Sequence, residues 1–204
     1  MTDATSLRSL AGLPAEPASL ADSTLILIDC QNTYIKGVLE LDGVQAALDE
    51  AAVLLDRARA AGIPIIHIQH DDGPGSLYDI HGESGAIVAR VAPRNGEPVV
   101  VKNYPNSFVG TDLEERLRAG SAANLVIAGF MTHMCVNSTA RGAFNLGFAP
   151  TVVAGATATR ALPLSGAGAG ADAVVPAPAV QLASLAALAD LFAIVVPGSA
   201  AVPD

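Results

Sequence analysis

The leading candidate for a nucleophile in the sequence is Cys135, which lies in the stretch LVIAGFMTHMCVNST. This stretch is typical of a buried strand, a tight polar turn and a helix whose first turn carries the cysteine. Backbone N–H groups at a helix start are unpaired and partly positive, so they bias a thiol towards the nucleophilic thiolate. A cysteine beside an apolar strand is more often a small buried hydrophobe, so the nucleophile hypothesis needs partners elsewhere in the chain.

Two charged residues that follow other apolar runs are the candidate partners. Asp29 ends the run TLILI, and Lys102 ends the run PVVV. The carboxylate can act as a general base, and it can equally cap a helix or bind a neighbouring loop. The lysine is either a solvated charge at a strand end or a cation directed into a cleft. Cys30 is predicted to point away from Asp29 and to lie in the core.

Apolar runs alternate with amphipathic segments along the chain, which predicts an α/β fold with a six-stranded, mostly parallel sheet covered by helices on both faces. In such sheets ligands bind beyond the carboxyl ends of the strands. Asp29, Lys102 and Cys135 follow the first, third and fourth predicted strands, so we expect them to converge on one cleft. Strands are predicted at 24–28, 63–68, 98–101, 124–129, 151–154 and 192–196, and helices at 42–61, 112–118, 135–146 and 181–191.

Local signals support some of these boundaries. Thr111 and Glu114 fit a capping box at the start of the second helix, and Gly62 follows the first helix as a stop. The segment GAGAG at 166–170 follows no strand and opens no helix, so it is predicted to be a turn and not a dinucleotide-binding loop.

A polar, glycine-rich segment at 69–97 joins the second and third strands, and loops of this length are usually functional. It contains His70, Asp71, Asp72 and His81, which are metal-ligand types. Their spacing gives sequence neighbours and not a convergent set of ligands. We therefore expect no metal site, and a loop that lines the rim of a pocket.

Composition limits the partners. The 204 residues carry 11 Lys and Arg against 20 Asp and Glu, and this net charge of −9 disfavours nucleic acid and anionic membrane surfaces. One domain spanning 1–204 is expected, with 1–22 as a surface or flexible segment. Two cysteines and the absence of a secretion signal favour a cytoplasmic protein with a small-molecule partner. The apolar stretch 173–196 is interrupted by prolines and Asp190, so it is interpreted as core and not as a membrane span.

Three blocks of sequence resemble the isochorismatase-like cysteine hydrolase superfamily, which includes nicotinamidases and N-carbamoylsarcosine amidohydrolases. In chain order they are ILIDCQNTY, VVVKNYPNSFVGTDLEERL and VIAGFMTHMCVNSTARGAF. The resemblance implies a three-layer sandwich and a triad of Asp29, Lys102 and Cys135. It also implies a cis peptide bond between Phe130 and Met131, and an oxyanion hole made by the backbone N–H groups of Met131 and Cys135. A homodimer or homotetramer without an organic cofactor is implied as well.

The chemistry implied by this resemblance is thiol catalysis. Asp29 would remove the proton of Cys135, the sulfur would attack a carbonyl carbon, and Lys102 would hold the thiolate and orient Asp29. The substrates expected are amides, ureido compounds, imides or lactams, because Cys135 is present. The predicted substrate-contacting residues are Gln31, Asn32, Tyr34, His70 and Phe108, and His133 is expected to be structural or to lie at the rim.

Departures from the family leave alternatives open. Metal-using nicotinamidases carry Asp-x-His after the second strand, whereas this chain has QHDD, so nicotinamide and its metal are not expected. One alternative is a vinyl ether hydrolase in which Asp29 acts as an acid and Cys135 is incidental. Another is a small-molecule binder without enzymatic activity, which the presence of all three triad residues disfavours.

Overall fold

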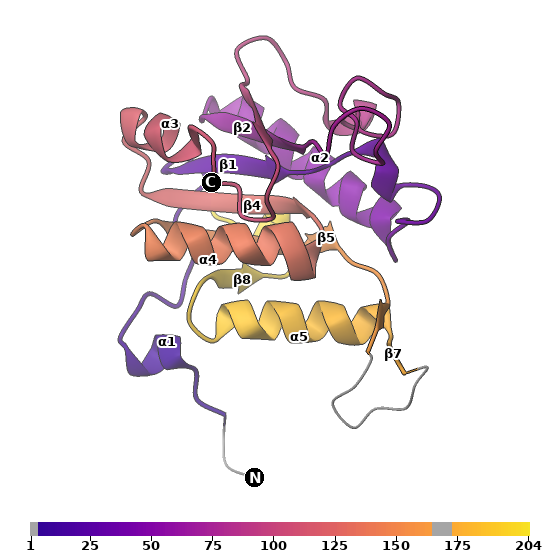
Figure 1. The fold of residues 1–204 in the computed structure, drawn as a ribbon. Coiled ribbons are helices and arrows are strands. Elements are labelled where there is room, and N and C mark those ends of the chain that lie inside the picture. Colours follow the sequence, from indigo (N-terminus) through magenta and orange to yellow (C-terminus); the bar gives the residue numbers. More distant parts are fainter. Residues whose placement is uncertain (1–3, 165–172) are drawn as a thin grey trace.

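The computed structural model describes residues 4–164 and 173–204, and a six-stranded sheet lies at its centre (Figure 1). The strands lie in the order β3-β2-β1-β4-β5-β8, and every neighbouring pair is parallel. Their bounds are β1 Ser23–Ile28, β2 Ile65–His70, β3 Val99–Lys102, β4 Asn124–Phe130, β5 Ala149–Ala158 and β8 Ile194–Val196. A short antiparallel pair, β6 Leu162–Pro163 and β7 Val174–Val175, lies apart from this sheet.

Helices cover both faces of the sheet, as predicted. Helix α2 (Val44–Ala61) lies on one face, while α3 (Leu113–Ala119), α4 (Asn137–Asn145) and α5 (Ala177–Ala189) lie on the other (Figure 1). Strand β1 shows how the sequence produces two cores, because successive side chains of a strand point to opposite faces. Leu25 and Leu27 pack with α2, whereas Ile26 and Ile28 pack in the cluster that contains α3 and α4 residues. The three-layer expectation is confirmed.

Helix α2 follows the predicted pattern closely. Its apolar positions are buried against the sheet, and it ends at Gly62, which adopts φ 67°. A left-handed residue at this position is most readily a glycine, and its N–H bonds to the carbonyl of Arg59. The long predicted helix between the first two strands is therefore present, beginning two residues later than expected.

The predicted capping box at Thr111 is wrong. Helix α3 begins at Leu113 with Asp112 at the N-cap position, and the Asp112 side chain makes no capping bond. The Thr111 hydroxyl accepts from the Leu113 N–H at 3.3 Å and donates to the carbonyl of Ser107 at 2.6 Å. Thr111 therefore binds the start of the helix from one residue before the N-cap, without the reciprocal bond from Glu114 that a capping box requires.

Strand β5 is ten residues long, whereas only four were predicted. Its pairing with β4 shifts register between Ile127 and Gly129, and this irregularity lets the strand continue to Ala158. Helix α5 begins four residues before the prediction, because Pro178 lies in its first turn, where a missing N–H costs no hydrogen bond. The β6/β7 pair was not predicted, and the predicted turn at 166–170 lies outside the described residues.

The described residues near both termini bond to the rest of the protein. Residues 4–22 are mostly exposed and contain α1 (Leu7–Leu10), with the Arg8 N–H bonded to the Asp190 carbonyl. The apolar stretch at 173–196 forms β7, α5 and β8. Within the described ranges, no helix is both long and apolar enough to cross a membrane. Short turns complete the chain: η1 Asn32–Tyr34, η2 Ala89–Val91, the π-helical η3 Thr132–Val136 and η4 Ser199–Ala201.

Candidate active site

Asp29 follows β1 at the carboxyl edge of the sheet and is completely buried. Its backbone lies in the left-handed region at φ 49°, which Asp tolerates better than most residues. The neighbouring strand approaches closely at Gly129, where φ is +117° and an added Cβ would lie 2.0 Å from the Ile28 carbonyl oxygen. Only glycine fits this approach, which brings the end of β4 against the end of β1.

Lys102 ends β3 and reaches the same place from two strands away. The ammonium Nζ lies 2.7 Å from Asp29 Oδ2 and 3.5 Å from Cys135 Sγ, and the side chain has no exposed surface. A buried ammonium without partners would be strongly unfavourable, so the pairing with Asp29 is what lets this lysine lie in the interior. The structure thus brings together the three residues that were expected to converge.

Cys135 lies within the π-helical turn η3, and α4 begins two residues later. The residue is 5% exposed, and burial raises the pKa of its thiol, with the Asp29 carboxylate acting in the same direction and Lys102 opposing both. This direction is opposite to the expected bias towards a thiolate, because desolvation outweighs the ammonium of Lys102. A thiol with a raised pKa needs a base to become a nucleophile.

Asp29 has the features of such a base. Burial raises the pKa of its carboxyl, and Lys102 acts in the opposite direction. Oδ2 accepts from Lys102, whereas Oδ1 is buried and has no hydrogen-bond partner among the described residues. Cys135 is close enough to Asp29 for the two groups to act on each other's pKa. The carboxylate therefore has a free lone pair beside a thiol that must lose a proton.

The backbone before Cys135 has the expected special geometry. The peptide bond between Phe130 and Met131 is cis. The carbonyl of Met131 accepts from the N–H groups of Met134 and Val136, at 3.0 and 3.2 Å. Among the turn, loop and cap hydrogen bonds of the described residues, none uses the Met131 N–H. That group is therefore available for the predicted oxyanion hole.

Two predicted substrate-contacting residues are buried. Gln31 is 0% exposed, and its amide bonds to the backbone of His70 and to the Gly85 carbonyl, so it holds the loop and does not face a substrate. Tyr34 is 1% exposed and packs edge-on against Phe130. Residues directly after a buried strand were expected to line a cleft, but the 69–97 segment folds back and covers them.

Asn32 and Phe108 have different surroundings. Asn32 donates to the Glu83 carbonyl and lines a cavity of about 530 Å³ together with Leu77. The Phe108 ring stacks on Phe148, with centroids 6.0 Å apart, beside the amino end of β5. Cys135 lies at the carboxyl end of the sheet, so the structure places the Phe108 ring in apolar packing, and its substrate contact stays a prediction.

The loop histidines have different surroundings. His70 ends β2 and contacts Lys102, while His81 is exposed. No group of three or more His, Cys, Asp or Glu side chains in the described part of the chain is placed to hold a metal. His133 bonds to the Thr159 hydroxyl, and burial lowers the pKa of its ring, so it joins η3 to the end of β5.

Sequence reasoning missed Tyr78. This residue lies in the 69–97 segment, and its hydroxyl is 3.2 Å from the Tyr34 hydroxyl. Its ring meets the His70 ring edge-on at 4.9 Å, and the charges of Cys135 and Asp29 both act on its pKa, which burial raises. An aromatic residue in a long polar loop was the available signal, but its position depends on tertiary contacts.

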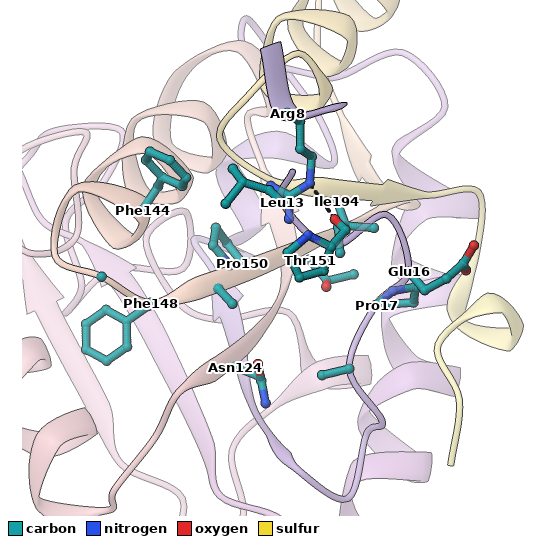
Figure 2. Close-up of a pocket in the computed structure, with 14 residues that line it drawn as sticks. Arg8, Leu13, Glu16, Pro17, Asn124, Phe144, Phe148, Pro150, Thr151 and Ile194 are labelled. Atoms are coloured by element: carbon teal, nitrogen blue, oxygen red, sulfur yellow. Dashed lines mark hydrogen bonds between the residues drawn. The ribbon is translucent and has the colours of Figure 1, made fainter. Parts of the chain in front are cut away.

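A second cavity, of about 400 Å³, lies at the opposite end of the sheet (Figure 2). Its wall includes Asn124, Thr151 and Ile194, which begin β4, β5 and β8 or lie close to their starts. Arg8 faces it, but the guanidinium already donates to the carbonyls of Pro14 and Leu191. The cavity is mostly apolar and far from Cys135, so it is not the candidate active site.

Comparison with known proteins places this arrangement among hydrolases. The isochorismatase domain family matches residues 23–196, which include all three converging side chains. The crystal structure of an isochorismatase from Pseudomonas putida KT2440 is 37% identical with a TM-score of 0.91, covering 98% of this chain and 99% of that one.

Two curated relatives are also similar over much of their length. The secreted isochorismatase effector Isc1 of Verticillium dahliae is 36% identical over 159 residues, which are 78% of this chain and 84% of that protein. The ureidoacrylate amidohydrolase RutB of Stutzerimonas stutzeri is 31% identical over 185 residues, covering 71% of this chain and 75% of that protein.

Proposed function

The chain belongs to the isochorismatase family of hydrolases, and on that premise we propose that it is a cysteine hydrolase that cleaves a C–N bond of a small molecule. One observation carries the proposal: a single buried ammonium, Lys102 Nζ, contacts both Asp29 and Cys135. A base, a nucleophile and a cation that meet in a solvent-excluded place are the parts that nucleophilic catalysis requires.

In the first step Asp29 takes the thiol proton and Cys135 Sγ bonds to the carbonyl carbon of the substrate. The pKa values of both groups are raised by burial, so the proton moves between groups whose charged forms are both disfavoured. Lys102 stabilises the anion that remains in either case. The negative oxygen of the tetrahedral intermediate would accept from the N–H groups of Met131 and Cys135, and each such donor contributes about 3 kcal/mol.

In the second step the C–N bond breaks and Asp29 returns its proton to the leaving nitrogen, which departs as an amine or ammonia. The acyl group is then a thioester on Cys135. Asp29 next removes a proton from water, the hydroxide attacks the thioester, and the carboxylic acid leaves as the thiol is restored. Every proton and bond is accounted for without an oxidant or an organic cofactor.

The substrate class follows from a relative and from the loop. RutB is named for hydrolysing ureidoacrylate, and we extend the range to amides, ureido compounds, imides and lactams. Tyr78 and Asn32 are the polar loop and turn residues that we propose for substrate contact, because neither is completely buried. Gln31 and Tyr34 are assigned to holding the site together.

Turnover is proposed to need no metal, and the assembly to be a homodimer or homotetramer in the cytoplasm. The metal proposal rests on the contact of His70 with Lys102, which leaves this ring nitrogen unavailable to a metal. The assembly proposal rests on α5, which has no charged residue and exposes 72% of Leu182. Because Isc1 is a secreted relative, fractionation of the source cells is the test of compartment.

Vinyl ether hydrolysis is the second candidate function, and one observation favours it. A carboxyl whose pKa is raised by burial can also donate a proton, so Asp29 could protonate an enol ether directly. Water would then capture the cation, and the thiol would have no part in the reaction.

A matched pair of cysteine variants separates the two functions. We expect purified protein to release ammonia or amine from amide and ureido compounds and to open the ring of lactams and cyclic imides, with turnover unchanged by EDTA. Cys135→Ala should abolish turnover, while Cys30→Ala, a buried cysteine in the α2 core, should keep it. If folded Cys135→Ala keeps more than about a tenth of the rate, a barrier change under roughly 1.4 kcal/mol, the covalent mechanism is wrong.

A further inference from the structure

The His70 side chain contacts the Lys102 ammonium. Its Nδ1 lies 3.0 Å from Lys102 Nζ, and its Nε2 lies 2.9 Å from Asp72 Oδ1. The side chain of His70 is 12% exposed, while that of Asp72 is 49% exposed. A chain of polar contacts therefore runs from the surface, through the imidazole, to the ammonium between Asp29 and Cys135.

Donor counting fixes the protonation state of this imidazole. An ammonium has three N–H donors and no acceptor, and Lys102 has three partners: Asp29 Oδ2, Cys135 Sγ and His70 Nδ1. Nδ1 must therefore present a lone pair, and the ring proton must be on Nε2, where it donates to Asp72. A second proton on Nδ1 would remove an acceptor and place two cations about 3 Å apart.

The backbone of His70, which carries the imidazole, is held on two sides. The Gln31 amide accepts from the His70 N–H and donates to the His70 carbonyl, both at 2.9 Å. In the sheet, His70 pairs directly with Lys102. The backbone from which the imidazole extends is therefore held by a completely buried side chain and by strand pairing.

We propose that His70 is a positioning residue that directs the Lys102 ammonium between Asp29 and Cys135. The effect on turnover rests on the proposed thiol mechanism, whereas the tautomer and the Lys102 contact do not. The reason is geometric, since the Nδ1 lone pair is one of the three acceptors that hold the ammonium.

The groups that face His70 come from every surrounding element. Two of them are acidic and have different partners. Asp72 accepts the proton on His70 Nε2, while Asp29 accepts from the same Lys102 ammonium as the imidazole does. The full set is Asp29 after β1, Lys102 on β3, Cys135 on η3, and Asp72 and Tyr78 from the loop.

Three variants test the proposal on activity. In His70→Asn the side-chain oxygen can replace Nδ1 as the acceptor, so turnover should stay within about tenfold of wild type. His70→Ala removes the acceptor, and kcat should fall about 100-fold with KM nearly unchanged. His81→Asn, the same change at an exposed histidine of the same loop, should match wild type in both kcat and KM.

A readout that needs no substrate separates this proposal from the proposed function. Side-chain ¹⁵N–¹H spectra should give His70 as the Nε2–H tautomer at neutral pH, with the signal assigned by its loss in His70→Asn. An Nδ1–H tautomer, or equal kcat in His70→Ala and wild type, would overturn the positioning role.

Discussion

Two clusters in this protein contain the same three kinds of group, a carboxylate, a cation and a histidine, and strand β2 contributes a histidine to each. His70 points towards Lys102 and Asp29, whereas His67 points towards Arg59 and Glu97. The two histidines are three residues apart, so strand alternation sends them to opposite faces of the sheet.

The clusters differ in how completely the carboxylate is satisfied. Arg59 donates to both oxygens of Glu97 at 2.8 Å, and the Arg94 N–H and His67 complete its partners. The hydrogen bonds from Arg59 are the main reason that the pKa of Glu97 falls to about 2. Asp29 has one oxygen without a partner, and burial moves its pKa in the opposite direction.

This difference separates a cluster that stabilises the fold from one that can perform chemistry. A carboxylate with all its lone pairs bonded is held in its charged form and is a poor proton acceptor. A buried carboxylate with a free lone pair and a raised pKa costs stability, and such groups gather at functional sites. We therefore expect substitutions in the two clusters to affect different measurements.

The largest expected effect is the loss of turnover when Lys102, the cation of the cluster that contains Asp29 and His70, is replaced. Lys102→Met should lower kcat/KM by about 100 to 1000-fold, because the thiolate and the tetrahedral intermediate lose their nearest positive charge. Asp29 can take up a proton once its cation is gone, so the far-UV circular dichroism should stay that of the wild type. Turnover close to wild type in a folded Lys102→Met protein would show that the cluster of Asp29, Lys102 and His70 is not needed for catalysis.

The next largest effect is a loss of folding stability when the cluster of Glu97, Arg59 and His67 is altered. Glu97→Gln should lower the unfolding free energy by about 2 kcal/mol, because hydrogen bonds to charged groups are lost in a mostly buried place. For a chain of this length that is a fall in Tm of about 4 to 8 °C, measured by calorimetry. kcat should not change. A loss of activity without a change in Tm would reverse the roles given to the two clusters.

The smallest effect is a pH dependence that has opposite signs in the two clusters. The folded pKa of Glu97 lies below its unfolded value of about 4.5, so its stabilisation is present above that pH and is lost as the pH falls towards 2. The folded pKa of Asp29 is raised, so its contribution is present below its unfolded value of about 3.8 and is lost as the pH rises through the folded value.

Thermal unfolding across pH measures these signs. The Tm difference between wild type and Glu97→Gln should narrow as the pH falls from about 4.5 to 2. The difference between wild type and Asp29→Asn should shift in favour of the variant as the pH rises above about 4. If the Tm difference from wild type changed with pH in the same direction for both variants, the two carboxylates would not be in contrasting environments.

Much of this arrangement was predictable because simple patterns carry it. Continuous apolar runs predicted strands covered on both faces. Because Asp29 and Lys102 each follow such a run, the sequence also placed them at one edge of the sheet. The length of β5 could not be predicted, since it depends on a register shift against β4. The family resemblance, and not the spacing, supplied the cis peptide bond and the pairing of roles.

The rest depended on tertiary contacts. Gln31 and Tyr34 follow a strand that ends at the site, but a folded-back loop buries them, and only the fold determines where that loop runs. Phe108 lies in one of the sequence blocks that resemble the family, yet its ring stacks on Phe148 at the other end of the sheet. Burial also moves the pKa of Cys135 against the expected direction, because a local helix-start argument leaves out the loss of solvent around the thiol.

The covalent intermediate is the central claim, and partitioning with hydroxylamine tests it most directly. During turnover of an amide or lactam substrate, a thioester on Cys135 should be intercepted, giving a hydroxamate whose share of the product rises with hydroxylamine concentration while substrate consumption continues. Cys30→Ala should give the same partition, and Cys135→Ala should give neither product. If the acid remains the sole product at every hydroxylamine concentration while turnover proceeds, water attacks the substrate directly and the account of Cys135 as nucleophile is wrong.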